Sequence, residues 1–142
     1  MASSTTVHPV LNAQQLLAMQ QLAREIVVEG LVKEYALKVM LGTQAATEYA
    51  PDSVRRFARF GSSPRGAQAL ILAAKIHALL HGRFNVAYDD VDEVAAPALR
   101  HRIILNFEGE AEGATSDDVI AEILKTAASR GAAIRPPLAV VG

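Results

Sequence analysis

Apolar residues recur at intervals of three and four along most of this chain, the spacing expected of a helix that buries one face. Five such stretches lie near residues 13–27, 31–41, 64–81, 89–102 and 117–127. Asn12 suits the N-cap of the first helix, and Gly30 marks a break before the second. The sequence therefore predicts an all-α fold, a small helical bundle of about five helices.

The apolar positions of these helices predict which side chains form the core. The first helix carries one apolar stripe, made of Leu16, Met19, Leu22, Ala23 and Ile26. In the second helix the residues expected to be buried include Leu31, Tyr35, Leu37, Val39 and Leu41. The third helix should turn inward Ala67, Leu70, Ile71, Ala74 and Ala78. We expect the core to form where these stripes meet.

The fourth predicted helix is marked by its charges. It opens with four acids within Asp89–Glu93 and closes with Arg100–Arg102, a polarity that matches the helix dipole at both ends. Pro97 lies inside the apolar pattern and should kink the helix without ending it. Gly82 suits the C-terminal stop of the preceding helix. The acidic segment Glu108–Glu112 is expected to be a solvated connector to the last helix.

Composition supports the helical prediction and bounds the function. The 142 residues include 26 alanines and 15 leucines but only seven aromatic residues, a balance that favours helices over strands. With no cysteine, disulfides, Fe–S clusters and thiolate zinc sites are excluded. A net charge of -1 argues against a globally basic nucleic-acid binder.

The pattern also predicts how the chain is organised and where the protein works. We expect a disordered lead-in at residues 1–9, one domain at 10–128 and a flexible tail at 129–142. The longest apolar stretch near the middle, Ala69–Leu80, is too short to span a bilayer, and no secretory signal is evident. The prediction is a cytoplasmic domain that binds neither membrane nor nucleic acid.

The start of the third helix carries the sharpest chemical feature. Ser62 or Ser63 can cap this helix, and Pro64 suits its first position. Arg65 follows in the first turn, where the positive end of the helix dipole disfavours a cation by about 0.3–1 kcal/mol. A bound anion removes that cost, and Gly66 leaves room for close approach. The segment Ser63-Pro64-Arg65-Gly66 is therefore a candidate phosphate or carboxylate site; the alternative is a capped helix with a solvated arginine.

Three motifs, in order, resemble the C-terminal helical lid of MoxR-type AAA+ ATPases. That family reads Gly-Ala-Ser-Pro-Arg, then a helix ending in Gly-Arg, then an acidic helix start, then Leu-x-His-Arg-Ile. The three matching motifs here are Gly61–Gln68, Gly82-Arg83 and Leu99–Ile103. The acidic helix start corresponds to Val86, Tyr88, Asp89, Asp90 and Val91, with Tyr88 in place of the helix-opening proline. The resemblance extends from about Val7 to Leu124.

The resemblance implies part of a nucleotide-dependent motor. The arginine matching Arg65 is the family's sensor 2 residue, which reaches the γ-phosphate of ATP held with magnesium by the adjoining AAA+ core domain. Ser63, Pro64 and Gly66 would shape its approach to the nucleotide. The family also implies ring homo-oligomers, expected to be hexamers, that remodel other proteins in a chaperone-like way and often work with von Willebrand factor A-domain proteins.

The chain departs from the family in what it contains. No Gly-x-x-x-x-Gly-Lys-Ser/Thr loop is present to cradle phosphates, and no apolar strand ends in paired acids for magnesium. We therefore expect that this chain alone neither binds nor hydrolyses ATP, and that the full-length parent does both. Many family members also carry an arginine at the position of Gln44, which leaves the role of that position open.

Other functions compete with the lid interpretation. His77 and His81 lie four residues apart on the third helix, but no third metal ligand is evident, so we predict no metal site. The basic run Arg55, Arg56 and Arg59 permits a helical nucleic-acid-binding module, although acids open its candidate recognition helix. A stand-alone protein-interaction domain is the remaining alternative.

Overall fold

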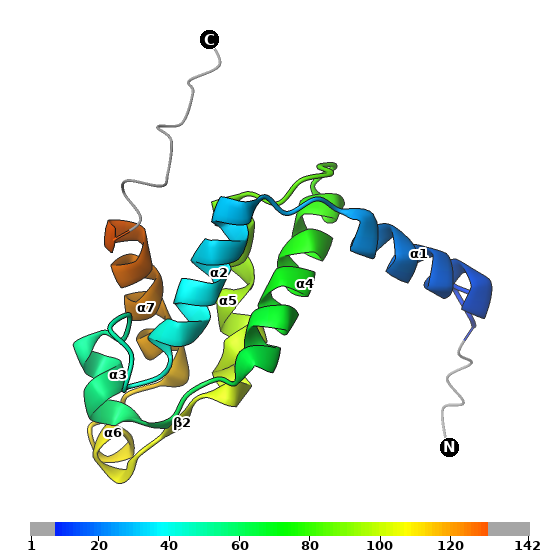
Figure 1. Cartoon of the computed structure of the whole chain (residues 1–142). Coiled ribbons are helices and arrows are strands. Elements are labelled where there is room, and N and C mark those ends of the chain that lie inside the picture. The colour runs from blue at the N-terminus through cyan, green and yellow to red at the C-terminus, as the bar shows by residue number, and fades with distance from the viewer. Residues whose placement is uncertain (1–7, 131–142) are drawn as a thin grey trace, which may run out of the picture.

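Four helices pack side by side around one apolar core in the computed structural model, which describes residues 8–130 (Figure 1). These are α2 (Gly30–Gly42), α4 (Pro64–Leu80), α5 (Tyr88–Leu99) and α7 (Ser116–Arg130). A further long helix, α1 (Ala13–Glu25), precedes them. The smaller elements are α3 (Asp52–Phe57), β1 (Ala58–Phe60), the 3₁₀ turn η1 (Arg100–Arg102), β2 (Ile104–Leu105) and α6 (Phe107–Ala111).

The five predicted helices and the all-α class are confirmed. Asn12 caps α1, where its side chain accepts the N–H of Gln15. Pro64 occupies the first position of α4, and Gly82, with φ +71°, follows the end of that helix as its predicted stop. α5 continues through Pro97 to Leu99. Local capping signals therefore located these helices well.

The pattern missed the two shortest helices, α3 and α6. Each is only five or six residues long, too short to display a helical period. The prediction for Glu108–Glu112 is wrong in that the segment is not a loop, although its glutamates are exposed to solvent as expected. α6 forms there, and the Arg56 guanidinium donates to Glu108, at 2.6 Å, and to Glu112. This ion pair links α6 to α3, although the two segments lie about fifty residues apart in the sequence.

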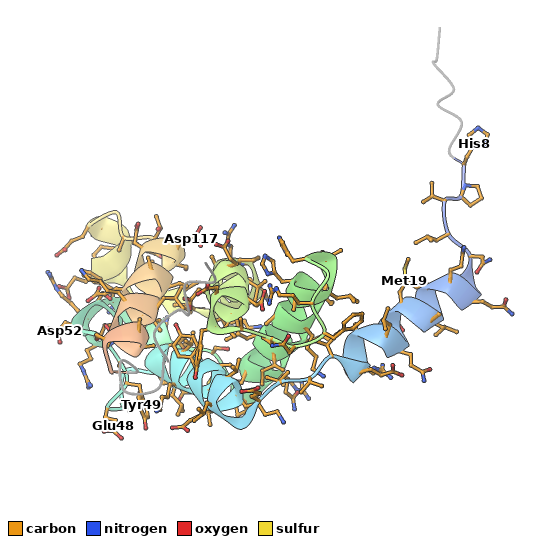
Figure 2. All side chains as sticks on the ribbon, turned by 90° about the horizontal axis from the view of Figure 1, so that it is seen from above. His8, Met19, Glu48, Tyr49, Asp52 and Asp117 are labelled. Carbon is orange, nitrogen blue, oxygen red and sulfur yellow. The ribbon has the colours of Figure 1, made fainter. Side chains whose placement is uncertain are left out.

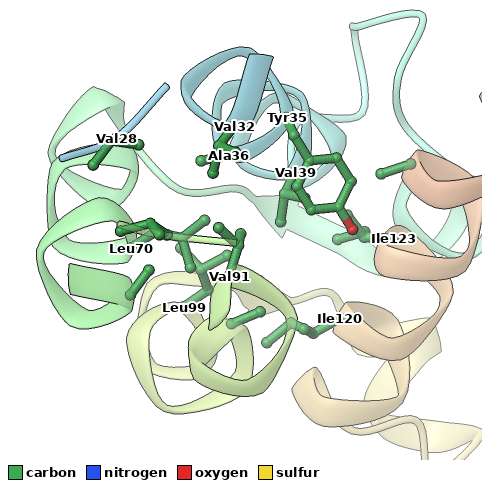
Figure 3. Close-up of a cluster of buried hydrophobic side chains, with 14 of the residues drawn as sticks. Val28, Val32, Tyr35, Ala36, Val39, Leu70, Val91, Leu99, Ile120 and Ile123 are labelled. Atoms are coloured by element: carbon green, nitrogen blue, oxygen red, sulfur yellow. The ribbon is translucent and has the colours of Figure 1, made fainter. Parts of the chain in front are cut away.

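The core lies where α2, α4, α5 and α7 meet (Figure 3). α2 buries Val32, Tyr35, Ala36, Val39 and Met40. Two of the residues predicted to be buried there, Leu31 and Leu37, are exposed, and Leu41 is half-buried. The prediction was wrong for these residues because α2 is apolar on more than one side. Only packing against α4, α5 and α7 selects the buried face.

Small residues let α4 and α5 approach closely. Leu70, Ala74 and Ala78 of α4 are fully buried, as are Ala95 and Leu99 of α5. Alanine has no long side chain to hold the helix axes apart, so each helix fills the groove of the other. The inward stripe predicted for α4 is confirmed at its centre, whereas its flanks, Ala67 and Ile71, are half-buried.

α1 extends away from the bundle (Figures 1 and 2). Within this helix only Ala23 is buried, while Leu16, Met19 and Leu22 are all at least 42% exposed. Their predicted apolar stripe therefore exists, but no described residue covers most of it. An isolated helix of this length is marginal in water. α1 consequently presents a surface suited to contact with another domain or chain.

A two-stranded antiparallel ribbon closes one end of the bundle. β1 pairs with β2 so that Ala58 lies opposite Leu105, and Phe60 opposite Ile104. The pairing brings the loop after β1 close to η1, at the same end as the start of α4.

Among residues 8–130, no helix is long and apolar enough to cross a membrane. α7 continues to Arg130, so two residues of the predicted tail are helical; the rest of that tail, and residues 1–7 of the predicted lead-in, lie outside the described residues.

A buried carboxylate fixes the other end of the α4–α5 pair. Asp90 is 1% exposed and receives hydrogen bonds from the Arg83 guanidinium (2.6 Å), the Ala87 N–H (2.7 Å) and Nδ1 of His77 (2.7 Å). Burial alone would raise the pKa of this carboxyl. The hydrogen bonds, with that of Arg83 the largest, outweigh burial and hold the pKa of Asp90 well below its ordinary value.

Replacing Arg83 with leucine should destabilise the fold by about 3 kcal/mol at pH 7, because it removes the principal partner of a buried carboxylate. Arg100→Leu is the matched control: its ion pair with Asp117 is half exposed and should contribute less than about 1 kcal/mol. Urea unfolding of both variants measures the difference. A loss for Arg83→Leu no larger than that for Arg100→Leu would contradict this assignment.

The same site predicts the direction of a pH effect on stability. Since the pKa of Asp90 is lowered in the folded state, its contribution is complete above the unfolded pKa of about 4. That contribution declines as the pH falls below this value, because the unfolded chain takes up the proton first. The stability difference between wild type and Arg83→Leu should therefore shrink in unfolding curves measured from pH 6 down to pH 3.

Candidate functional site

The predicted site residues lie together at the start of α4. Ser63 is the N-cap residue of this helix, although its side chain makes no capping hydrogen bond, and Pro64 follows at the first position. The Arg65 side chain is exposed and forms no hydrogen bond or ion pair with any residue in the described part of the chain. The N–H of Gly66 already donates to the Ser63 carbonyl, at 2.7 Å. The guanidinium of Arg65 is therefore the main free donor of the segment.

Two residues at the end of α2 hold the loop that leads into α4. The backbone N–H of Ser62 donates to Oγ1 of Thr43 at 2.8 Å, and the Ser62 carbonyl accepts from Nε2 of Gln44 at 2.8 Å. Thr43 and Ser62 are almost completely buried. Sequence reasoning missed these contacts, because they join residues about nineteen positions apart. The only local signal was a polar Thr-Gln pair that ends an apolar helix.

Two glycines permit close packing around this loop. A Cβ on Gly61 would lie 2.1 Å from the backbone oxygen of Thr43. A Cβ on Gly66 would lie 1.8 Å from Oγ of Ser62 and 3.3 Å from the side chain of Leu99. The expected role of Gly66, to leave room for a ligand, therefore needs correction. The space beside it is filled by Ser62 and Leu99, so Gly66 shapes the site by letting the loop and α5 approach α4.

The end of the bundle that holds Arg65 is rich in cations. Because α5 runs antiparallel to α4, its C-terminus and η1 lie beside the start of α4, as the closeness of Leu99 to Gly66 shows. Exposed His101 and half-buried Arg102 belong to this turn, and Arg102 donates to the Ala98 carbonyl at 3.2 Å. Arg100 of the same turn is paired with Asp117, so Arg65, Arg102 and the N-terminus of α4 are the groups that favour an anionic ligand or surface here.

The other candidate residues do not join this site. His77 and His81 lie in and just after the last turn of α4, where their rings stack 4.3 Å apart and His77 bonds to Asp90. No group of three or more possible metal-ligating His, Asp or Glu side chains occurs in residues 8–130.

Most of the basic run is used inside the fold. Arg55 donates to the carbonyls of Ala45 (3.0 Å) and Thr47 (2.8 Å), and Arg56 forms its ion pair with α6. Arg59 lies over the ring of Phe60. All three side chains are exposed, but each has a partner within the fold, which weakens the case for a nucleic-acid-binding surface.

Gly61→Ala should destabilise the protein by about 1–3 kcal/mol, because the added methyl overlaps a backbone oxygen that cannot move without shifting α2. Gly30→Ala is the control, since a Cβ there meets no atom within 4 Å, and it should be neutral or slightly stabilising. Thermal unfolding of the two variants provides the comparison. Equal melting temperatures would show that the loop is not tightly packed on Thr43.

Comparison with known proteins identifies relatives of this chain. A family model described as AAA lid domain matches residues 52–123. Chaperone MoxR1 of Mycobacterium tuberculosis (strain ATCC 25618 / H37Rv) is 32% identical over 119 residues, which are 84% of this chain and 32% of that protein. Protein MoxR of Paracoccus denitrificans is 49% identical over 51 residues, 36% of this chain and 15% of that protein.

A solved structure agrees with these matches. The crystal structure of a candidate ATPase from Cytophaga hutchinsonii ATCC 33406 superposes with a TM-score of 0.75 at 30% identity, covering 80% of this chain and 34% of that one. The chain spans about a third of the length of MoxR1 and of this ATPase. From the matching family model, these relatives and the shared helical fold, we conclude that the chain belongs to the AAA lid domain family and is a lid of the MoxR type.

Proposed function

We propose that this lid completes the ATP site of a MoxR-type AAA+ ATPase and that Arg65 is its sensor 2 residue. The observation that carries the proposal is the free guanidinium of Arg65 in the first turn of α4, at the cationic end of the bundle. In this function Arg65 contacts the γ-phosphate of ATP, and Ser63, Pro64 and Gly66 set the path of the backbone around it.

The chemistry of arginine suits this role. A guanidinium is permanently charged and planar, so it can donate two hydrogen bonds to phosphate oxygens. The dipole of α4, a helix of 17 residues, adds positive potential at the same point. During hydrolysis, negative charge on the transferring phosphoryl group is stabilised by donors already held in place. Arg65 would therefore stabilise the transition state more than the bound substrate.

The remaining parts of the ATP site belong to another domain. This chain contains no phosphate-binding Gly-Lys-Ser/Thr loop, and its match covers only 32% of MoxR1. In the proposed assembly an adjoining AAA+ core domain binds ATP and magnesium, and the lid adds Arg65. Loss of the γ-phosphate breaks that contact and lets the lid rotate against the core. The parent would act as a ring homo-oligomer, a hexamer, that remodels client proteins with a von Willebrand factor A-domain partner.

The face of α4 that carries Arg65 is also apolar. Leu72 and Ile76 follow Arg65 at spacings of seven and four, so they share its face, and they are 47% and 42% exposed. Next to them is an open groove of about 270 Å³ between α1 and α4, lined by Arg24, Gln68, Ile71, Leu72 and Lys75. A domain that presents ATP to Arg65 must lie against this face. We therefore assign the groove and the exposed side of α1 to contact with the AAA+ core domain.

Arg65→Ala in the full-length parent should lower ATP turnover about tenfold or more, equivalent to at least about 1.4 kcal/mol of transition-state stabilisation. ATP should still bind, because the core domain holds the other phosphates. Steady-state turnover and the affinity for a fluorescent ATP analogue separate the two effects. Lys125→Ala, which removes an exposed cation from α7, is the control and should leave turnover within twofold. Unchanged turnover in Arg65→Ala would refute the sensor role.

Leu72→Glu tests the assigned contact with the core domain. In this 142-residue chain the exposed side chain should tolerate the change within about 0.5 kcal/mol. In the full-length parent the buried charge should separate lid from core and reduce ATP turnover severalfold. Leu37→Glu, on the outer side of α2 at 46% exposure, is the matched control. Equal effects of the two substitutions on the parent would argue that the α4 face is not the contact.

A further inference from the structure

We infer that Thr43 and Gln44, at the C-terminal end of α2, are positioning residues that hold Arg65 in its productive place. The inference rests on the proposed sensor role of Arg65 and extends it to an element that does not touch the nucleotide. It also gives a role to Gln44, the position at which the sequence departs from many related lids.

The side chains of Thr43 and Gln44 form hydrogen bonds to the N–H and to the carbonyl of Ser62. Oγ1 of Thr43 accepts the Ser62 N–H at 2.8 Å, and the same hydroxyl donates to the carbonyl of Met40 at 2.7 Å. Nε2 of Gln44 donates to the Ser62 carbonyl, also at 2.8 Å. The N–H and the carbonyl of Ser62 are thus bonded to two consecutive residues at the C-terminal end of α2. This arrangement fixes the position of Ser62 and also the orientation of its peptide groups.

Little freedom remains between Ser62 and Arg65. Ser63 has the extended conformation of an N-cap, and the ring of Pro64 restricts its own φ. The Gly66 N–H bonds back to the Ser63 carbonyl, which closes the first turn around Arg65. The packing of Gly61 against the Thr43 carbonyl holds the loop from the other side. The backbone of Arg65 is therefore held both by α4 and, through Ser62, by the end of α2.

Burial distinguishes the hydrogen bonds at Ser62 from ordinary loop packing. In the described part of the chain, the buried polar or charged residues are Thr43, Ser62 and Asp90. Two of the three therefore lie at this one contact. Buried hydrogen bonds are directional, and leaving one partner unpaired is costly, so they define one geometry where apolar contacts would tolerate several. A sensor arginine needs such a geometry, because small displacements of a catalytic donor cost much of its effect.

The test uses ATP turnover and nucleotide affinity of the full-length parent. Thr43→Val removes the hydroxyl while keeping the shape, and Gln44→Leu removes the amide donor. Each should lower kcat about tenfold with the KM for ATP changed less than about twofold, since Arg65 is misplaced while the core still binds nucleotide. Thr43→Ser and Gln44→Arg, which retain a hydroxyl and an N–H donor, should keep nearly full turnover.

A double-mutant comparison shows whether the two residues act through Arg65. In the Arg65→Ala background, neither Thr43→Val nor Gln44→Leu should lower turnover further. Thr115→Val is the control: its hydroxyl donates to Asp118 at the start of α7, at 2.5 Å, and forms no hydrogen bond to Thr43, Gln44 or Ser62. It should leave kcat within twofold.

Each contrary result has a distinct meaning. If Arg65→Ala lowers turnover but Thr43→Val and Gln44→Leu do not, the positioning role is wrong and the sensor role stands. Further loss in the Arg65→Ala background, or an equal loss from Thr115→Val, also overturns positioning, because the effect then does not pass through Arg65. Unchanged turnover in Arg65→Ala removes the sensor role and the positioning role together. If Thr43→Val does not fold, the half-buried Gln44 carries the same comparison.

Discussion

The close packing of α4 against α5 is the constraint on which the rest of the lid depends. Alanines at the centre of this contact bring the two antiparallel helices together, and each end of the contact then fixes one part of the lid. At one end Asp90 reaches His77 and Arg83. At the other end Leu99 packs against Gly66, where a longer residue would not fit. The buried carboxylate and the start of α4 are therefore positioned by the same pair of helices.

This arrangement gives the lid two electrostatically different ends. The first turn of α5 carries Asp89 and Asp90, while Arg100–Arg102 follow its last turn. Because α4 runs the opposite way, its N-terminus and Arg65 lie at the end with the cations. The helix dipole of α4 and the side chains of η1 thus favour an anion at the same place.

The interior of the lid is closely packed, whereas part of its surface exposes apolar side chains. Its four-helix core is closed, but α1 and the outer face of α4 expose leucines and an isoleucine in neighbouring positions. Such surfaces are typical of contacts between domains. The free donor of the site, Arg65, lies on the same side. This is the face that we propose for contact with the AAA+ core domain, and the hydrogen bonds from the end of α2 to Ser62 connect it to the rest of the bundle.

The sequence by itself determined the five long helices and the position of Arg65, because these depend on signals local to each helix. Asn12, Pro64 and Gly82 act on the backbone within one turn, so they can be recognised without knowing the fold. The motifs around Arg65 likewise lie in one continuous segment. The place of Arg65 in the first turn of α4 was therefore predicted correctly, whereas its role stays a prediction.

Only the tertiary structure decided which apolar residues are buried and what holds the site. Leu31 and Leu37 are as apolar as Val39, and only the packing of neighbouring helices leaves them outside. The hydrogen bonds from Thr43 and Gln44 to Ser62 join two segments that are separated along the chain by a loop, a short helix and a strand. A hydrogen bond between distant residues depends on how the chain folds back on itself, and no periodicity along the sequence records that path.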